Sequence, residues 1–385
     1  MNIFIPLGLF LFLITFAARN KAEGSQKAFL FSFLALFVFA GLRYNFGPDY
    51  DSYGDNFSML KSLGVEGFLD YNQHSETWFV YFFNLFNSYF LFIIVQSLIW
   101  LGVSYWFFKN NVPEKYYYLV ILMMFFNINF SLLNFTAMRS SLAGCFFFVA
   151  LMILTSTSDL DNRQKKGLFG FLSNWKLIVY LLLVYVGSFF HTSVIIFIIF
   201  PFITRDKNIS KSSANTLLGI GVVLAVIAVM FRTTITLGVS LWLIDLFPSS
   251  FERYEDYLEM LKGGGGGLGA LLFNSMRILI LYPILHALTV EKDTRYLRLM
   301  QFAVIFSYTF LLINENLLSR FTMCFYPVIV VSLLRSCKYV NNSQRMLSVF
   351  SLLFLSLFQF YMNINTPSYK SYMVYHTIFS APYWQ

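Results

Sequence analysis

Long apolar segments constrain this sequence more than any other feature. They follow one another along almost the whole chain, and most contain no charged residue. They lie near residues 1–18, 28–42, 78–108, 117–134, 137–155, 177–189, 190–203, 214–231, 269–289, 299–313, 319–334 and 346–363. A transmembrane helix needs about 20 predominantly apolar residues, whereas barrel strands alternate apolar and polar residues. We therefore predict an all-α integral membrane protein with about 12 transmembrane helices.

The composition excludes the main soluble alternatives. Hydrophobic residues make up 58% of the chain and charged residues only 12%, whereas an ordinary soluble domain contains about 25% charged residues. A chain with so few charges cannot cover the surface of a soluble enzyme or a nucleic-acid-binding domain. The 3 cysteines of the 385 residues also exclude a disulfide scaffold.

The basic residues are concentrated in alternate loops. With an outward-facing amino terminus, the inward loops are 19–28, 109–116, 156–176, 204–213, 290–298 and 335–345. These loops contain 18 of the 27 Lys and Arg and 7 of the 19 Asp and Glu, a net charge of +11 against −3 for the other residues. Cytoplasmic loops of membrane proteins show this excess of Lys and Arg. The net charge of +8 therefore indicates topology, and we expect no nucleic-acid partner.

Two outward segments are too long to be simple connections. Residues 43–76 contain six Asp or Glu against Arg43 and Lys61. Residues 232–268 contain a 14-residue apolar stretch from 234 to 247, then a charged stretch and a run of glycines at 263–267. An apolar stretch of that length favours a re-entrant or interfacial helix over a thirteenth span. We treat the chain as one polytopic membrane domain, residues 1–385, with extended outer loops at 43–76 and 232–268.

Several ionisable residues are predicted to lie near the outer membrane boundary, where charges are costly and often functional. They are Arg43, Arg139, His191, Arg232, Arg277 and Arg320. One interpretation is that each arginine pairs with an outward carboxylate or extends to the lipid headgroups. As a group they favour an anionic ligand, because a guanidinium binds two phosphate oxygens at once. The Asp49-Tyr50-Asp51 sequence is too common a pattern to indicate a metal site, and we predict no metal or other cofactor.

The ordered motifs resemble those of EpsG-like and Wzy-type polysaccharide polymerases. The segment GLRYNFGPDYDSY at 41–53 is similar to the R-x-x-x-G-x-D-x-x-x-Y signature of their first outer loop. Four further elements are also similar. They are a glutamate directly before an apolar helix, an arginine at the start of a helix, a histidine followed by small residues at a helix start, and an arginine in a helix late in the chain. The matching residues in this sequence are Arg43, Gly47, Asp49, Tyr53, Glu76, Arg139, His191 and Arg320. This sequence departs from the pattern at Pro48 and in the run of glycines.

The resemblance implies a metal-independent membrane glycosyltransferase with a GT-C-like helix bundle in the bacterial inner membrane. Such an enzyme joins oligosaccharide repeat units carried on undecaprenyl pyrophosphate at the periplasmic face, for O-antigen or exopolysaccharide elongation. Its partners would be the lipid-linked donor and acceptor, the bilayer and a chain-length regulator of the Wzz type. The leaving pyrophosphate would need cations, which assigns Arg43, Arg139 and Arg320 to it, with Arg277 and Arg232 as weaker candidates.

The acceptor hydroxyl would need a general base, and three residues compete for that role. We assign it to His191, because histidine titrates near pH 6.5 in model compounds. Glu76 would orient the histidine or act as the base itself. Asp49 would orient an arginine, because it closely follows Arg43. Two other functions stay open: a lipid-linked oligosaccharide flippase, and another membrane glycosyltransferase or ligase on the same fold.

Overall fold

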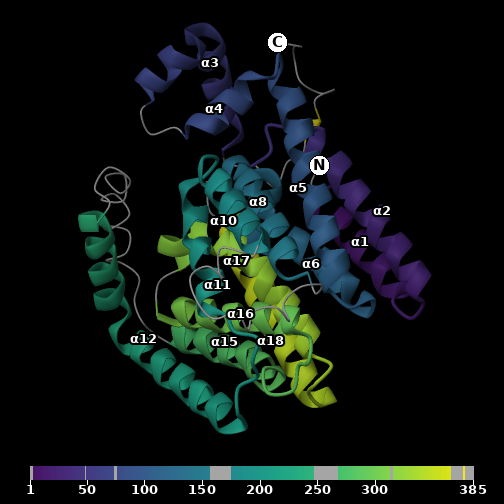
Figure 1. Ribbon diagram of the computed structural model, residues 1–385. Coiled ribbons are helices and arrows are strands. Elements are labelled where there is room, and N and C mark those ends of the chain that lie inside the picture. The colour runs from purple at the N-terminus through teal and green to yellow at the C-terminus, as the bar shows by residue number, and fades with distance from the viewer. Residues whose placement is uncertain are drawn as a thin grey trace. The chain divides into compact units, whose positions relative to one another are not determined.

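The computed structural model describes residues 3–47, 49–72, 76–156, 175–246, 268–312, 315–365 and 376–377. Most of these residues lie in helices joined by short connections, which confirms the predicted all-α class (Figure 1). The chain divides into two compact units. Unit 1 contains the residues up to Pro201 and those from Ser356 onward, and unit 2 is Phe202–Leu355.

Unit 1 is a helix bundle with two outer helices at one end. Within it, α8 packs against α5 and α10, α1 against α6, and α2 against α5. Helices α3 and α4 pack on each other and lie beyond the ends of α5, α8 and α10 (Figure 1). Its elements are α1 (Phe4–Ala18), α2 (Ala22–Gly41), β1 (Arg43–Tyr44), α3 (Tyr50–Tyr71), α4 (Thr77–Asn84), α5 (Tyr89–Asn111), η1 (Glu114–Tyr116), α6 (Tyr117–Phe126), α7 (Ile128–Phe135), α8 (Met138–Leu154), α10 (Trp175–Ser188), η3 (Thr192–Ile199) and β2 (His376–Thr377).

Two apolar runs of unit 1 are interrupted. The run at 78–108 forms the short helix α4 and then the long helix α5. The run at 117–134 bends by 67° between α6 and α7, at Asn127. The Asn134 side chain donates to the Met124 carbonyl at 2.7 Å and accepts from the Trp100 indole at 2.7 Å. A break of this kind frees backbone groups from the helix, and a neighbouring polar side chain compensates one of them here.

Unit 2 contains four longer helices, among which α15 packs on α12, α16 and α17. They are α12 (Lys211–Leu246), α15 (Leu268–Ala287), α16 (Thr294–Leu312) and α17 (Glu315–Ser336); α11 (Phe200–Ile203) and α18 (Asn342–Ile364) cross the division between the units. Part of the predicted outer segment 232–268 is helical, because α12 continues to Leu246 after a break at Phe231 (φ −121°, ψ 19°). The rest of that loop, 247–267, lies outside the described residues.

The chain is a multi-pass membrane protein, although the lengths of its helices do not establish twelve spans. Four helical stretches of the described residues are long and apolar enough to cross a membrane, and the bent pair α6 and α7 makes five. The four are Ala22–Gly41, Tyr89–Asn111, Lys211–Phe231 and Asn342–Met362. Other apolar runs form shorter helices, such as the 15 residues of α1. A hydrophobic run gives no length for its helix, because breaks and caps are set by neighbouring elements.

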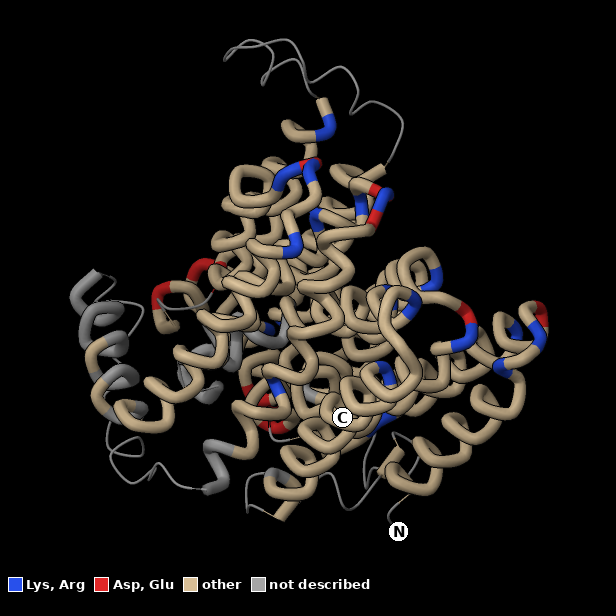
Figure 2. Tube along the Cα trace, turned by 90° about the horizontal axis from the view of Figure 1, so that it is seen from below, with Lys and Arg blue, Asp and Glu red and all other residues tan. Residues whose placement is uncertain are grey.

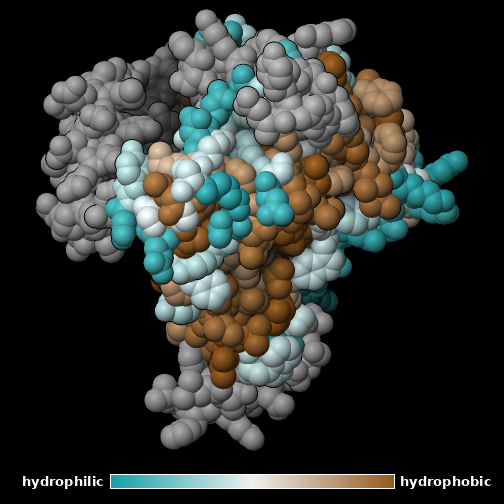
Figure 3. Space-filling view, turned by 90° about the horizontal axis from the view of Figure 1, so that it is seen from above, coloured by the Kyte–Doolittle hydropathy of each residue, from teal (hydrophilic) through white to brown (hydrophobic). Residues whose placement is uncertain are grey.

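The surface is consistent with a lipid environment. Large apolar side chains are exposed along α1, α2 and α12, including Phe10, Phe31 and Val223. Figure 3 shows broad hydrophobic areas on one face of the molecule, between smaller hydrophilic patches. Charged residues gather mainly at helix ends and connections (Figure 2). Exposed apolar surface of this extent is expected where lipid replaces water.

Each unit brings its predicted inward loops together. In unit 1, the Ser25 hydroxyl donates to the Glu114 carbonyl at 2.9 Å, which joins loops 19–28 and 109–116. In unit 2, the Asn208 amide donates to the carbonyls of Leu288 and Glu291, both at 2.9 Å. Loop 335–345 joins them through Lys338, whose ammonium lies 3.2 Å from a Glu291 carboxylate oxygen.

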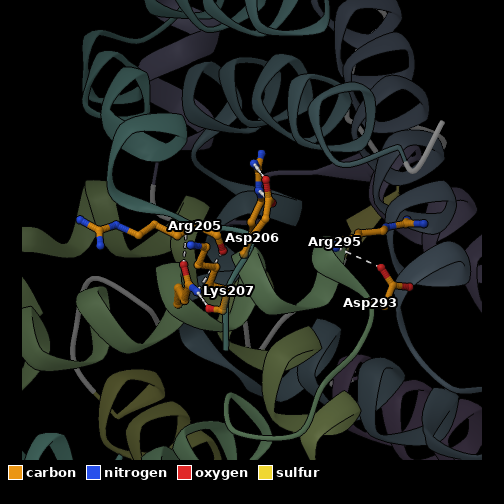
Figure 4. Close-up of polar contacts among 7 residues, drawn as sticks. Arg205, Asp206, Lys207, Asp293 and Arg295 are labelled. Atoms are coloured by element: carbon orange, nitrogen blue, oxygen red, sulfur yellow. Dashed lines mark hydrogen bonds and ion pairs between the residues drawn. The ribbon is translucent and has the colours of Figure 1, made fainter. Parts of the chain in front are cut away.

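Ion pairs fix the inward loops of unit 2. The guanidinium of the fully buried Arg298 donates to both carboxylate oxygens of Asp206, at 2.6 Å for Nη2. Figure 4 shows Asp206 in this cluster, with the Arg205 side chain pointing away and Asp293 contacting the backbone of Arg295. Burial alone would raise the pKa of Glu291, but hydrogen bonds from the Asp293 backbone and the Tyr339 and Lys338 side chains lower its pKa overall. Breaking the Arg298 pair would leave an uncompensated buried charge.

The opposite end of unit 1 contains the first outer segment. Strand β1 pairs antiparallel with β2, with Arg43 opposite Thr377 and Tyr44 opposite His376. The Phe4 ring contacts the Phe46 ring with centroids 5.7 Å apart. The start of α1, residues 43–46 and residues 376–377 therefore lie at one end of the unit.

Reporter fusions test the membrane topology. Fusions after Lys27, Lys207 and Lys338 are expected to report the cytoplasm, because these residues belong to the basic loops. Fusions within 55–70 or after Gln385 are expected to report the periplasm. A paired alkaline phosphatase and fluorescent-protein reporter measures both outcomes. A cytoplasmic signal at 55–70 would place the predicted site on the wrong side of the membrane and overturn its assignment.

Candidate functional site

Three of the predicted residues meet in unit 1. Glu76 lies between Arg139 and His191, and each of its carboxylate oxygens faces one of them. Arg139 Nη1 donates a hydrogen bond to Glu76 Oε2 and forms an ion pair with it. His191 Nδ1 lies 3.5 Å from Glu76 Oε1. The three residues are far apart in the sequence, and the fold alone makes them one cluster.

Helix ends position all three side chains. Glu76 directly precedes α4, and its carbonyl accepts from the Val80 amide at 3.1 Å. Arg139 is the second residue of α8. His191 has an extended backbone (φ −160°, ψ 118°) and joins α10 to η3. Polar residues are favoured at helix ends, where backbone groups are unsatisfied, so the chain can place a charge there without interrupting an apolar span.

The cluster is partly shielded from solvent. The Glu76 side chain is 11% exposed and that of His191 8%, whereas Arg139 is 31% exposed. A carboxylate buried to this degree requires a charged or hydrogen-bonding partner. Arg139 provides such a partner, and His191 Nδ1 lies 3.5 Å from the other carboxylate oxygen. The arginine is therefore both the partner of Glu76 and the member of the cluster that a ligand reaches most readily.

The outer helix α3 provides a fourth residue. The Arg139 side chain forms a hydrogen bond with the Tyr53 side chain as well as with Glu76. The Tyr53 ring packs against the buried Phe79 of α4, with centroids 6.1 Å apart. Tyr53 belongs to the signature segment, but the sequence alone predicts no role for it. Its position in that signature was the only signal that could have marked it.

Aromatic side chains surround the cluster. Trp78 stacks on Phe189 with centroids 5.4 Å apart, and Phe190 contacts Phe82 at 6.0 Å and Phe146 at 5.2 Å. These rings follow Glu76 or precede His191 in the chain. They place apolar groups beside the polar cluster and lower the local dielectric, which strengthens its electrostatic interactions.

Arg43 lies in the core of unit 1. It is fully buried, and its Nη1 donates to the Ala40 carbonyl and, at 3.1 Å, to the Ser97 hydroxyl. At the adjacent position of α5, the Gln96 side chain donates to the Ser141 hydroxyl of α8 at 2.6 Å. In this conformation solvent does not reach Arg43. Its predicted role in pyrophosphate binding therefore stays a prediction, and it would require the surrounding chain to open.

The remaining signature residues shape the loop between β1 and α3. Asp49 is exposed, and its carbonyl accepts the first backbone hydrogen bond of α3 from the Tyr53 amide at 3.0 Å. Gly47 has a φ of +102°, and an added Cβ would lie 2.8 Å from Thr136 Oγ1 and 2.9 Å from the Phe135 carbonyl oxygen. Glycine is required here for two reasons, the backbone conformation and the close approach to the end of α7.

Replacing Gly47 with Ala is expected to destabilise the protein by about 2–4 kcal/mol, from positive-φ strain and overpacking together. Gly64 is a matched control, because it has a φ of +71° but no atom within 4 Å of an added Cβ. Gly64→Ala should cost about 1–3 kcal/mol from backbone strain alone, because its ψ of 174° lies in a region almost exclusive to glycine. Thermal unfolding of the purified proteins in detergent measures both. Equal losses would show that the contact with α7 contributes nothing.

The other predicted arginines belong to unit 2. Arg277 lies in α15, half-buried, and its Nη1 donates to the Asn274 side chain at 3.2 Å. Arg232 lies in α12 directly after the break at Phe231, and Arg320 lies in α17. The side chains of Arg232 and Arg320 lie outside the described part of the structure. The predicted anion-binding roles of these three arginines stay predictions.

The cluster has the properties of an acid–base site. Within the described ranges, no group of three or more His, Cys, Asp or Glu side chains is placed to bind a metal ion. Glu76 and His191 together resemble a base and its orienting carboxylate. Arg139 and Tyr53 provide hydrogen-bond donors beside them. The arrangement can take a proton from one group while stabilising negative charge on another.

Comparison with known proteins identifies a family. No similarity was found to a curated protein or to a solved structure. The sequence model of the EpsG family matches residues 27–377, which include the signature segment and every residue of the cluster. Since this match extends over most of the 385 residues, the chain belongs to the EpsG family.

Proposed function

We propose that this protein is a polysaccharide polymerase, a glycosyltransferase that joins oligosaccharide repeat units carried on undecaprenyl pyrophosphate. Membership of the EpsG family suggests a role in polysaccharide biosynthesis. The observation that supports the polymerase reaction is the placement of one carboxylate, Glu76, between a histidine and an arginine. The reaction would take place at the periplasmic face of the bacterial inner membrane.

The reaction needs two kinds of group, and the cluster contains both. The acceptor sugar hydroxyl attacks the anomeric carbon of the donor, and the bond from that carbon to the pyrophosphate oxygen breaks. Negative charge develops on the leaving undecaprenyl pyrophosphate, which a fixed guanidinium stabilises. Arg139 is the exposed guanidinium of the cluster and is assigned to this role. The hydroxyl proton passes to a general base.

The geometry favours His191 as that base. Its Nδ1 faces Glu76, so Nε2 is the nitrogen assigned to the acceptor hydroxyl. A carboxylate beside Nδ1 fixes the ring tautomer and stabilises the imidazolium that forms when the proton arrives. Glu76 is therefore assigned as the orienting group. Asp49 is exposed at the start of α3 and is a weaker choice, because an acceptor hydroxyl there would remain in water.

The resting cluster also explains how the site keeps its charges in place before substrate binds. Arg139 is neutralised by Glu76 in this structure. A pyrophosphate carries more negative charge than a carboxylate, and it would compete for the same guanidinium. As Arg139 turns to the phosphate, Glu76 would be left to its second partner, His191. Substrate binding would in this way strengthen the interaction that makes the histidine a better base.

Polymerisation by the purified protein is the decisive measurement. The full chain in nanodiscs is supplied with an undecaprenyl-pyrophosphate-linked repeat unit from the source strain, and products are separated by length. A polymerase gives a ladder of glycans and releases undecaprenyl pyrophosphate. A deletion strain separates the alternatives in the cell. Loss of a polymerase leaves single-repeat glycan on the surface, whereas loss of a flippase leaves none there.

A further inference from the structure

The hydrogen bond between Tyr53 and Arg139 links two parts of the protein that have different surroundings. Arg139 belongs to the bundle helix α8, and Tyr53 belongs to α3 in the outer segment. A guanidinium has only donors, so Tyr53 Oη accepts from Arg139. Tyr53 contributes a phenol oxygen to Arg139, whereas the other partner, Glu76, contributes a carboxylate.

One face of α3 packs against α4 and α5 and forms hydrogen bonds with them. The Tyr89 hydroxyl donates to the Tyr50 carbonyl at 2.8 Å. Along the same face, the Phe57 ring packs on Phe83 with centroids 5.0 Å apart. One further turn along, Lys61 Nζ donates to the Asn84 carbonyl at 2.7 Å. Residues 50, 53, 57 and 61 follow the spacing of one helix face, so Tyr53 lies on the anchored side of α3.

These contacts determine the position of the Tyr53 hydroxyl. The ring is held against Phe79 of α4, and α4 begins directly after Glu76. The two partners of Arg139 are therefore fixed by neighbouring elements, one at the start of α4 and the other on the helix that packs against it. Together they define the plane of the guanidinium.

The two partners respond differently to an anionic ligand. A phosphate oxygen competes with Glu76 for Arg139, because both are negatively charged. It repels the Glu76 carboxylate but not the phenol oxygen of Tyr53, and the five N–H donors of a guanidinium allow Tyr53 and a phosphate to bind at the same time. When an anion displaces Glu76, the bond to Tyr53 is the contact that keeps the guanidinium aligned.

We propose that Tyr53 is a positioning residue, which holds the Arg139 guanidinium in place for a phosphate or pyrophosphate group. This proposal rests on the proposed function, because it specifies how the same arginine receives the leaving group of the lipid-linked donor. The outer helix α3 thereby contributes a residue to the site. Tyr53 acts through Arg139, and its hydroxyl does not take part in proton transfer.

Probe binding tests the proposal without turnover. The probe is undecaprenyl pyrophosphate itself, titrated into the full-length protein in detergent and followed by intrinsic tryptophan fluorescence. Tyr53→Phe removes only the hydroxyl and keeps the ring against Phe79. We expect it to weaken probe binding about tenfold, the effect of one hydrogen bond to a charged group. Tyr71→Phe is the control, because Tyr71 is at the other end of α3 and 70% exposed; its affinity should not change.

A double-mutant cycle separates positioning from a general structural effect. In an Arg139→Lys background, Tyr53→Phe should weaken probe binding by less than about twofold, because the fork that Tyr53 aligns is gone. An equal tenfold loss in both backgrounds would show that Tyr53 acts independently of Arg139. Unchanged binding in Tyr53→Phe alone would also overturn the proposal. Thermal unfolding of each variant checks that a loss of binding does not reflect a loss of folded protein.

The same samples distinguish failure of this proposal from failure of the proposed function. A wild-type protein that binds the probe with the expected coupling but makes no polymer would refute the polymerase and leave the role of Tyr53 intact. A wild-type protein that makes polymer but shows no coupling would refute the role of Tyr53 alone. Absence of both probe binding and polymer would refute both.

Discussion

Replacing Arg139 with Lys is expected to reduce polymerisation at least about 100-fold, the usual effect of removing one fixed donor from a developing oxyanion. Lysine keeps the positive charge but loses the planar fork that binds two phosphate oxygens. It also cannot keep Glu76 and Tyr53 as simultaneous, directed partners. The measurement is the rate of glycan elongation by purified protein with a lipid-linked repeat unit.

Two further variants define what the result means. Arg19→Lys is the matched control, because Arg19 lies half-buried at the end of α1, away from the cluster in the chain, and donates to the Phe16 carbonyl at 2.8 Å; it should keep the full rate. Arg320→Lys, a change at the late arginine of the family resemblance, should also lose most of the rate. All variants should be recovered from the membrane at normal levels. Normal glycan length in both Arg139→Lys and Arg320→Lys would refute the role of these arginines in pyrophosphate binding. They would then only pair with carboxylates or extend to the lipid headgroups.

Replacing His191 with Gln is expected to lower the rate by about 10²- to 10⁴-fold, the contribution of a general base. Glutamine is similar in size and can hydrogen-bond to Glu76, but it cannot take a proton. In the wild type, the rate should fall as the pH is lowered through the pKa of the base, because a protonated histidine is no longer a base. That acidic limb should be absent from the residual rate of His191→Gln. The measurement is a pH–rate profile for each protein.

The profile of Glu76→Gln separates the orienting role from the base itself. If Glu76 is the orienting residue, Glu76→Gln should lower the rate but keep the acidic limb. The limb should shift to lower pH, because the imidazolium has lost its neighbouring anion. If His191→Gln keeps the full rate and the same acidic limb, the histidine is a core residue. The base would then be Glu76 or Asp49, and the limb should disappear in one of those variants.

The motif residues illustrate the limits of interpretation by sequence. Arg43 and Arg139 were both assigned to the pyrophosphate, because each is a signature arginine near an outer helix end. The structure buries Arg43 completely and leaves Arg139 partly exposed beside Glu76 and His191. Chain position does not determine the exposure of a side chain. Gly47 is the opposite case. The signature marked this glycine in the sequence, but only the fold shows why glycine is needed there, namely its close approach to Thr136.

The sequence by itself determined the class of the protein, and it predicts a side of the membrane for each loop and a boundary position for the candidate charges. These follow from apolar runs and from the distribution of Lys and Arg, which are local properties of the chain. Only the tertiary structure decided that α6 and α7 are bent by 67° and that Tyr53 and Glu76 share Arg139. These features depend on contacts between residues far apart in the chain. Side-chain packing and hydrogen bonding between separate helices set them, and no local pattern of residues encodes either.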